Sequence, residues 1–94
     1  MSQSLTPGVE QAVTLATTVT LCLPTKPVRT LVVYSSDVLL YLVTGVADGA
    51  ALPSTGRRLL AAAAITDPIE HDISAYGAWG LAGSGSGTAR VEVR

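Results

Sequence analysis

Apolar and β-branched residues alternate along the first part of the chain. Between Val13 and Leu23, the odd positions carry Val, Leu or Thr, and the positions between them carry Thr, Ala or Cys. A repeat of two is typical of a strand, and the many threonines disfavour a helix because β-branched side chains lose rotamer freedom there. Residues 13–23 therefore predict one strand or two short strands.

Prolines and a polar turn divide the next part of the chain. Pro24 and Pro27 end the first pattern, because proline cannot donate a hydrogen bond within a central sheet ladder. Residues 28–34 and 38–44 then predict two strands joined by a short Ser-Ser-Asp turn, and we expect this pair to form a hairpin. Residues 38–43 are apolar at every position. That pattern is typical of a strand covered on one side by the core and on the other by something else.

The C-terminal half is less regular. Residues 57–65 contain two leucines followed by four alanines, so they predict either a short helix or a strand of small side chains. Residues 73–81 alternate weakly. Residues 83–87 read Gly-Ser-Gly-Ser-Gly and predict a flexible hairpin loop. Residues 89–94 alternate cleanly, which places the valines toward the interior and the charged residues toward solvent.

The spacing of these segments indicates the fold class. About six short strands, with turn residues every 8 to 12 positions, predict an all-β protein. We expect a small antiparallel β-sandwich or a jelly-roll-like barrel. Residues 1–8 are polar and contain Pro7-Gly8, so they predict a flexible N-terminal arm. Residues 9–94 predict a single β domain, since 94 residues leave no room for a second one.

Composition adds the expectation of a contact surface. Apolar residues make up 48% of the chain and charged residues 14%, against about a quarter charged in an ordinary soluble domain. A domain of this size buries only about 60% of the surface of its unfolded chain. We therefore expect neighbouring subunits to cover part of the surface. The candidate interface residues are large apolar or aromatic side chains, namely Leu39, Tyr41, Val43, Tyr76 and Trp79.

Charge and hydropathy argue against two classes of partner. The net charge is −1, and among the basic residues only Arg57 and Arg58 are adjacent, which is a poor footprint for nucleic acid. The uncharged stretches are diluted by Thr, Ser and Gly and do not predict a membrane-spanning helix. Cys22 is the only cysteine, so an intrachain disulfide is excluded, which fits a reducing compartment.

Three sequence features suggest chemistry, and each has a simpler explanation. His71 lies among Asp67, Glu70 and Asp72, but a metal site would need further His or Cys ligands, so we interpret this segment as a solvated acidic loop. Cys22 sits in a β-branched run, where a buried and inert thiol is usual. Residues 52–56 resemble the sortase recognition pentapeptide, but the order of the flanking segments is wrong, and we interpret them as a turn. We expect no catalytic residue, no cofactor and no metal ion.

The aromatic residues leave a further alternative open. They could form a platform on which a sugar stacks, or they could be core and interface anchors. The aromatic residues in question are Tyr34, Tyr41, Tyr76 and Trp79. A ligand-binding or carbohydrate-binding β module therefore remains an alternative function.

Several segments together resemble a known class of proteins. These are the strand Thr30-Leu-Val-Val-Tyr34, the strand pair around residues 35–37, the turn between Gly49 and Pro53, and the closing segment of residues 83–91. They resemble small virion proteins of tailed bacteriophages, of the head decoration (cement) and head-spike-base types. The resemblance implies a non-enzymatic protein on the capsid surface of the virion, made in the host cytoplasm. It would bind the major capsid protein and its own copies, often as a trimer. Another virion subunit, such as a tail, fibre or spike-base protein, is the alternative.

Overall fold

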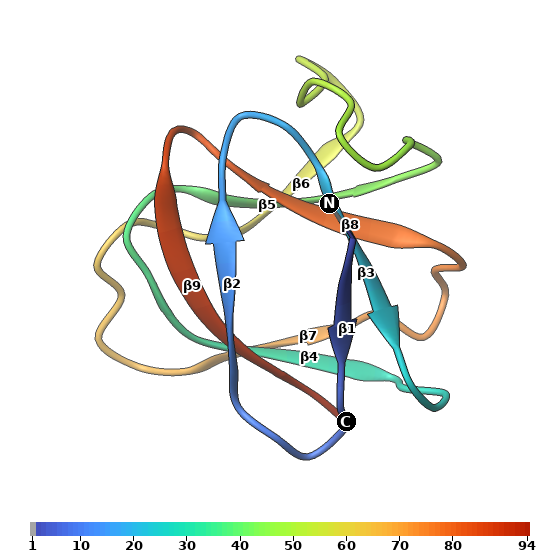
Figure 1. The fold of residues 1–94 in the computed structure, drawn as a ribbon. Coiled ribbons are helices and arrows are strands. Elements are labelled where there is room, and N and C mark those ends of the chain that lie inside the picture. The colour runs from blue at the N-terminus through green and yellow to red at the C-terminus, as the bar shows by residue number, and fades with distance from the viewer. Residues whose placement is uncertain (1) are drawn as a thin grey trace.

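The computed structural model describes residues 2–94, in which all regular structure is extended. The nine strands in this part of the chain are β1 (Gln3–Leu5), β2 (Gln11–Leu15), β3 (Thr20–Pro24), β4 (Thr30–Ser36), β5 (Leu40–Thr44), β6 (Arg57–Ala61), β7 (Ile69–Asp72), β8 (Trp79–Gly83) and β9 (Gly87–Val93). They form a five-stranded sheet in the order β1-β3-β8-β5-β6 and a four-stranded sheet in the order β2-β9-β4-β7. Figure 1 shows the arrangement.

The pairing of strands β2 to β9 is nested. Strand β2 pairs with β9, β3 with β8, β4 with β7 and β5 with β6, all antiparallel. This winding, distributed over two facing sheets, is the jelly roll. The structure thus confirms the all-β class and selects the jelly roll from the two predicted arrangements. The predicted number of strands, about six, is too low.

The predicted flexible N-terminal arm is wrong for residues 3–5. They form β1, which pairs with β3 in the parallel direction, whereas the other strand pairs of residues 2–94 are antiparallel. Leu5 is buried in the core and anchors the strand. One apolar residue in a polar stretch gives no periodic signal, which is why the pattern did not predict this strand. Met1 lies outside the described residues.

The two predicted hairpins are connections between sheets. Strands β4 and β5 belong to different sheets, and so do β8 and β9. The two connections pack on each other: a Cβ added to Gly83 would lie 2.7 Å from Val38, and one added to Gly87 would lie 3.0 Å from Asp37. The glycines of residues 83–87 therefore allow a close approach of two chain segments, where the sequence had suggested flexibility.

Two further ambiguous segments are strands. The segment predicted as either helix or strand begins with β6 and ends in a turn, in which Ala64 has a φ of 55°. The predicted acidic loop around His71 contains β7, so that interpretation is wrong. Strand β7 alternates, with half-buried Ile69 and His71 between exposed acidic residues. Periodicity was hidden in both segments because each strand has only four or five residues.

Strand β5 is covered on its core face and, at Val43, also on its outer face, as its sequence predicts in part. Leu40 and Leu42 lie in the core between the sheets. On the outer side, Val43 joins Val19 and Ala82 in a second small cluster. Val46 and Leu52 pack against that cluster; they belong to residues 45–56, which connect β5 to β6 and project at the top right of Figure 1. The cover thus comes from the same chain.

The surface holds few large apolar side chains. Only Val9, Leu23 and Leu59 are exposed among the large hydrophobic residues from Ser2 to Arg94. The accessible surface, 4896 Å², is close to the roughly 5,100 Å² usual for a protein of this mass. Much of the apolar composition is alanine, which is often exposed here. The chain therefore hides most of its large apolar residues unaided, and partner subunits remain a prediction.

Candidate interaction surface

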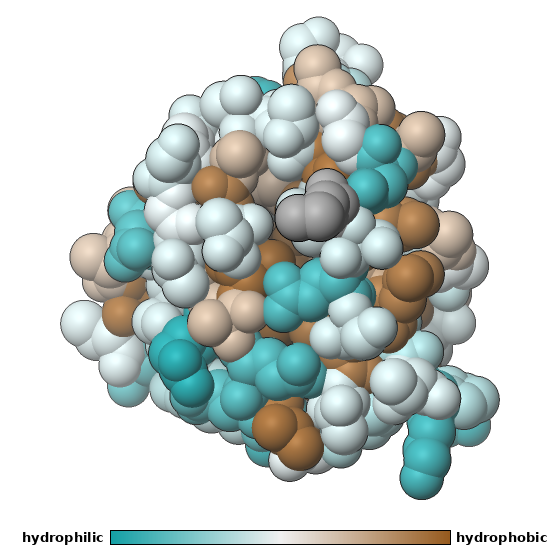
Figure 2. Space-filling view, viewed as in Figure 1, coloured by the Kyte–Doolittle hydropathy of each residue, from teal (hydrophilic) through white to brown (hydrophobic). Residues whose placement is uncertain are grey.

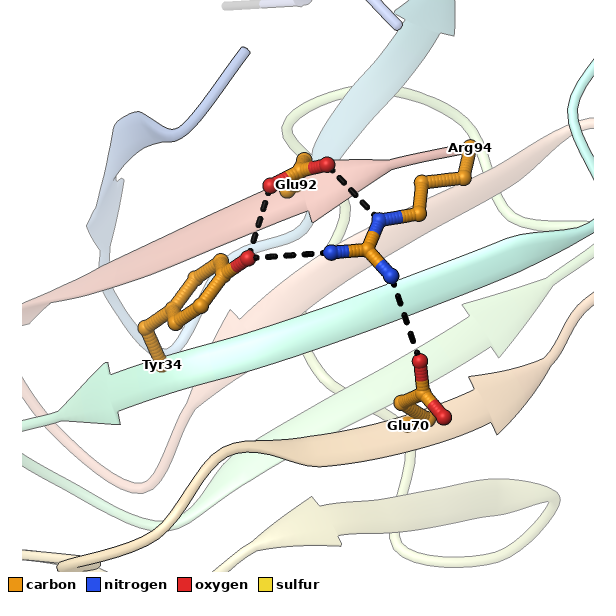
Figure 3. A network of polar contacts seen from close by, with 4 residues as sticks. All are labelled: Tyr34, Glu70, Glu92 and Arg94. Atoms are coloured by element: carbon orange, nitrogen blue, oxygen red, sulfur yellow. Dashed lines mark hydrogen bonds and ion pairs between the residues drawn. The ribbon is translucent and has the colours of Figure 1, made fainter. Parts of the chain in front are cut away.

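The outer face of the four-stranded sheet carries paired charges. The Tyr34 hydroxyl donates to Glu92 over 2.7 Å, and Arg94 Nε donates to the other Glu92 oxygen over 2.7 Å. Arg94 also reaches Glu70 and the Tyr34 oxygen, each over 3.4 Å, as Figure 3 shows. These hydrogen bonds, chiefly that from Arg94, hold the pKa of the Glu92 carboxyl below its usual value. Charges satisfied in this way are typical of a hydrated surface.

A further ion pair follows the same sheet toward β2. Arg90, on β9, donates to the carboxylate of Glu10, which precedes β2. The outward residues of β2 that alternate with the core residues Val13 and Leu15 are Ala12 and Thr14. This face therefore offers small and polar groups whose charges already have partners within the chain.

The outer face of the five-stranded sheet is different. Leu21 and Leu23 lie on β3 to either side of the core residue Cys22, so they point outward. At the other end of the sheet, Tyr41 of β5 lies opposite Leu59 of β6. Leu23 and Leu59 are 44% and 53% exposed. Two of the three exposed large hydrophobic residues thus lie on this sheet.

Tyr41, Arg57 and Leu59 together form what we call the Tyr41 surface. The guanidinium carbon of Arg57 lies over the Tyr41 ring, 4.4 Å from its centroid, in a cation–π contact. Within residues 2–94, the Arg57 side chain makes no hydrogen bond or ion pair. Beside it lies an open depression of about 380 Å³, lined also by Leu52 and Ser84. An arginine that keeps its donors free is available to a partner.

The edges β6 and β7 are tied together by side chains. His71 Nε2 lies 2.7 Å from the Leu60 carbonyl and donates to it, so Nδ1 accepts from Arg58 over 3.3 Å. Arg58 also donates to the Tyr76 hydroxyl and to the Asp72 carbonyl. Burial lowers the pKa of His71; the bond to Leu60 opposes this effect and the charge of Arg58 adds to it. Both ring nitrogens are engaged, so His71 serves as a neutral tie between the sheets.

The opposite edges, β1 and β2, are tied by two glutamines. Gln3 donates to the Ala12 carbonyl over 2.8 Å, while Gln11 accepts from the Thr6 amide over 2.6 Å and donates to the Ser4 carbonyl. Figure 2 shows this side, where hydrophobic residues appear as separate patches among polar ones. Edge strands occupied in this way present few free groups for pairing with another chain. The faces of the sandwich are thus the surfaces best suited to contact.

The structure does not bring the predicted interface residues together. Tyr41 lies on the surface defined above, and Leu39 is half-buried just before β5, where its amide binds Ser84. Val43 and Trp79 are 2% and 4% exposed. The prediction is wrong for these two residues, because each is packed within its own chain.

Tyr76 and Tyr34 lie away from the Tyr41 surface. Tyr76 is half-buried against the core and accepts from Arg58 beside β6 and β7. Tyr34 belongs to the outer face of the four-stranded sheet. The four aromatic residues therefore do not form one stacking platform. Arg57 and Leu59 were missed as candidates because residues 57–65 did not read clearly as a strand; their spacing of two was the available signal.

The structure also places Cys22 and the carboxylates that the sequence suggested as candidates for chemistry. Cys22 is 2% exposed, which confirms the predicted burial, and this burial raises its pKa to about 12. Its low reactivity stays a prediction. No group of three or more His, Cys, Asp or Glu side chains suited to a metal ion occurs in residues 2–94. The same range contains no helix long and apolar enough to cross a membrane.

No protein-family model, curated protein or solved structure matches the chain.

Proposed function

We propose that the protein is a non-enzymatic structural component of a phage particle, which binds the exterior of the head as a decoration or cement protein. One observation carries the proposal: the two outer faces of the jelly roll differ. One face has its charges paired within the chain, and the other presents Tyr41, Leu59 and the unpaired Arg57. Tyrosine and arginine are enriched among the residues that dominate interfaces.

The fold and the composition support the same proposal. Jelly rolls occur in capsid proteins, although they also occur in lectins, so the fold alone assigns no role. The tied edges favour contact through a face, without exchange or addition of strands. Copies joined in an oligomer bind a shell through several contacts at once, so a small surface patch on each copy suffices for strong retention.

The test is binding to empty shells assembled from the major capsid protein. We expect the purified protein to sediment with the shells, and Leu59→Asp to abolish this while remaining folded, because Leu59 is exposed. Thr14→Asp, on the outer face of the four-stranded sheet, is the matched control and should bind normally. Light scattering after size-exclusion chromatography reports self-association. Wild-type protein that stays monomeric and leaves the shells unbound would refute the proposal.

Two alternatives have their own tests. Another virion subunit, in a tail, fibre or spike base, would be recognised by antibody labelling of particles away from the head surface. A carbohydrate-binding module is favoured by the depression beside Tyr41. Binding on a glycan array that is lost in Tyr41→Ala, together with no binding to shells, would support that function instead.

A further inference from the structure

We propose that the Tyr41 surface recognises a single carboxylate side chain, an Asp or Glu flanked by an apolar residue, on the shell protein. The inference rests on the proposed function and names the chemistry of its contact. The carboxylate would accept from the Arg57 guanidinium, and the apolar neighbour would cover Leu59.

Among the arginines on and beside strands β6 and β9, Arg57 is the one whose guanidinium has no polar partner within residues 2–94. The other arginines of β6 and β9 have partners: Arg58 binds His71 and Tyr76, and Arg90 binds Glu10. The Arg94 guanidinium is held by Glu92 and Glu70. Arg57 contacts only the face of an aromatic ring, which uses none of its five N–H donors. The ring limits where the guanidinium can lie, so less freedom is lost on binding.

The number of unpaired cationic side chains next to Tyr41 favours a carboxylate over a phosphate group as the bound anion. A phosphate group carries close to two negative charges, and it would need a second cation beside Arg57. The adjacent Arg58 is turned to the tie between the sheets and is not available. One guanidinium matches one carboxylate, with which it forms two parallel hydrogen bonds.

The apolar surroundings of Arg57 favour a carboxylate on a protein side chain over one on a free acid or an acidic sugar. Leu59 is 53% exposed, and Leu52 lines the depression next to Arg57. An acidic side chain on a protein brings apolar neighbours that can cover these leucines, whereas a free acid or an acidic sugar brings mainly hydroxyl groups. Burial of the leucines also excludes water from the ion pair, which strengthens it.

Shell binding by Arg57→Gln tests the proposal. We expect the variant to bind about 10- to 100-fold more weakly than the wild type, which is the loss typical of a hot-spot residue. Raising the salt concentration should weaken the binding of the wild type more than that of the variant, because only the wild type has the ion pair. Arg90→Gln, on the other sheet, is the matched control and should behave as the wild type. Melting followed by circular dichroism checks that each variant is folded.

Cross-linking identifies the partner group. In Arg57→Lys, a water-soluble carbodiimide should join the new amine to a shell Asp or Glu, and peptide mass spectrometry should locate the bond. Thr14→Lys is the control for amines on the opposite face. No cross-link to the shell should form at residue 14 of the control, and none should form at Arg57 of the wild type.

The outcomes separate this inference from the proposed function. If the wild type binds shells and Leu59→Asp does not, while Arg57→Gln binds normally and Arg57→Lys forms no cross-link, the proposed function stands and the carboxylate inference is wrong. If the wild type does not bind shells, both fail. Binding of uronic-acid glycans that depends on Arg57, without shell binding, would assign the surface to a sugar and overturn the inference.

Discussion

Replacement of Gly80 by alanine tests whether the chain itself covers the part of the outer face of the five-stranded sheet around Val19. Gly80 lies on β8, opposite Leu21 of β3. A Cβ added at this position would lie 2.5 Å from Val19 Cγ1 and 2.8 Å from the Thr20 carbonyl oxygen. Carbon atoms in contact usually lie about 3.5–4.0 Å apart. The Thr20 backbone can retreat only if the pairing of β3 with β8 is disturbed.

The cost follows from two opposing effects. Overpacking a well-packed site typically destabilises by about 1–3 kcal/mol. Alanine also restricts the unfolded chain more than glycine does, which returns about 0.4–1 kcal/mol. We therefore expect Gly80→Ala to lower the free energy of unfolding by about 1–2 kcal/mol. For a domain of this size the melting temperature should fall by roughly 5–15 °C.

Urea denaturation and thermal melting, both followed by circular dichroism, measure the effect. Gly77→Ala is the matched control, because Gly77 lies in the loop before β8 with no atom within 4 Å of an added Cβ. The control should be neutral or slightly stabilised, by at most about 1 kcal/mol. If the two variants have the same stability, Val19 does not pack on Gly80, and the covering of this part of the outer face is refuted.

Three further predictions test other parts of the structure. The pKa of His71 is below its ordinary value of 6.5 in the folded protein, so the unfolded chain binds the proton first as the pH falls. The free energy of unfolding should therefore decrease from pH 6.5 down to the folded pKa, and His71→Gln should remove this slope in pH-dependent urea titrations; an equal slope in both proteins would contradict the tie. Cys22 should be inert to a thiol-reactive disulfide reagent at pH 8 and react fully in urea, whereas fast reaction in the native protein would mean that the site opens readily. Leu42→Ala should lower stability by about 2–5 kcal/mol in the same titrations, because Leu42 is 2% exposed in the core. A loss below about 1 kcal/mol would place Leu42 outside the core.

The sequence predicted strands best where one face of the strand is buried and the other is exposed to solvent. Strand β9 is an example, since Val91 and Val93 are buried while Arg90 is exposed, as its alternation predicts. The segment of residues 13–23 likewise gives two strands, β2 and β3. In such strands the period of side-chain burial equals the period of the backbone, so the pattern survives without knowledge of the partners.

The pairing of strands was not predictable in the same way. A short polar turn joins two strands equally well within one sheet or across two, and the Ser-Ser-Asp turn does the latter. What distinguishes the cases is contact between distant segments, such as the Thr88 amide with the Asp37 carboxylate, separated by 51 positions. Local sequence carries no signal for such contacts.

The candidate surface was predictable only in part, for a related reason. Tyr41 was identified because it is aromatic in an apolar strand. Arg57 becomes a candidate only through its contact with the Tyr41 ring. Tyr41 lies 16 positions earlier in the chain and is brought near by the pairing of β5 with β6. Val43 and Trp79 were wrongly assigned to an interface because the composition suggested that the core is too small to bury all large apolar side chains. Many of the apolar residues are alanines on the surface, each of which exposes little apolar area, so the core can hold the larger side chains.

Nested pairing also explains why side chains tie the edges of so small a protein. The first strand of the jelly roll pairs with the last, so the two sheets close on each other only after distant segments have met, and each sheet is left with two edges. The ties run between the sheets, from Gln3 and Gln11 on one side and from Arg58 and His71 on the other. Their groups bind carbonyl oxygens that a foreign strand would need. Under the proposed function many copies would lie at high local concentration, where blocked edges prevent pairing between copies and leave contact to a face.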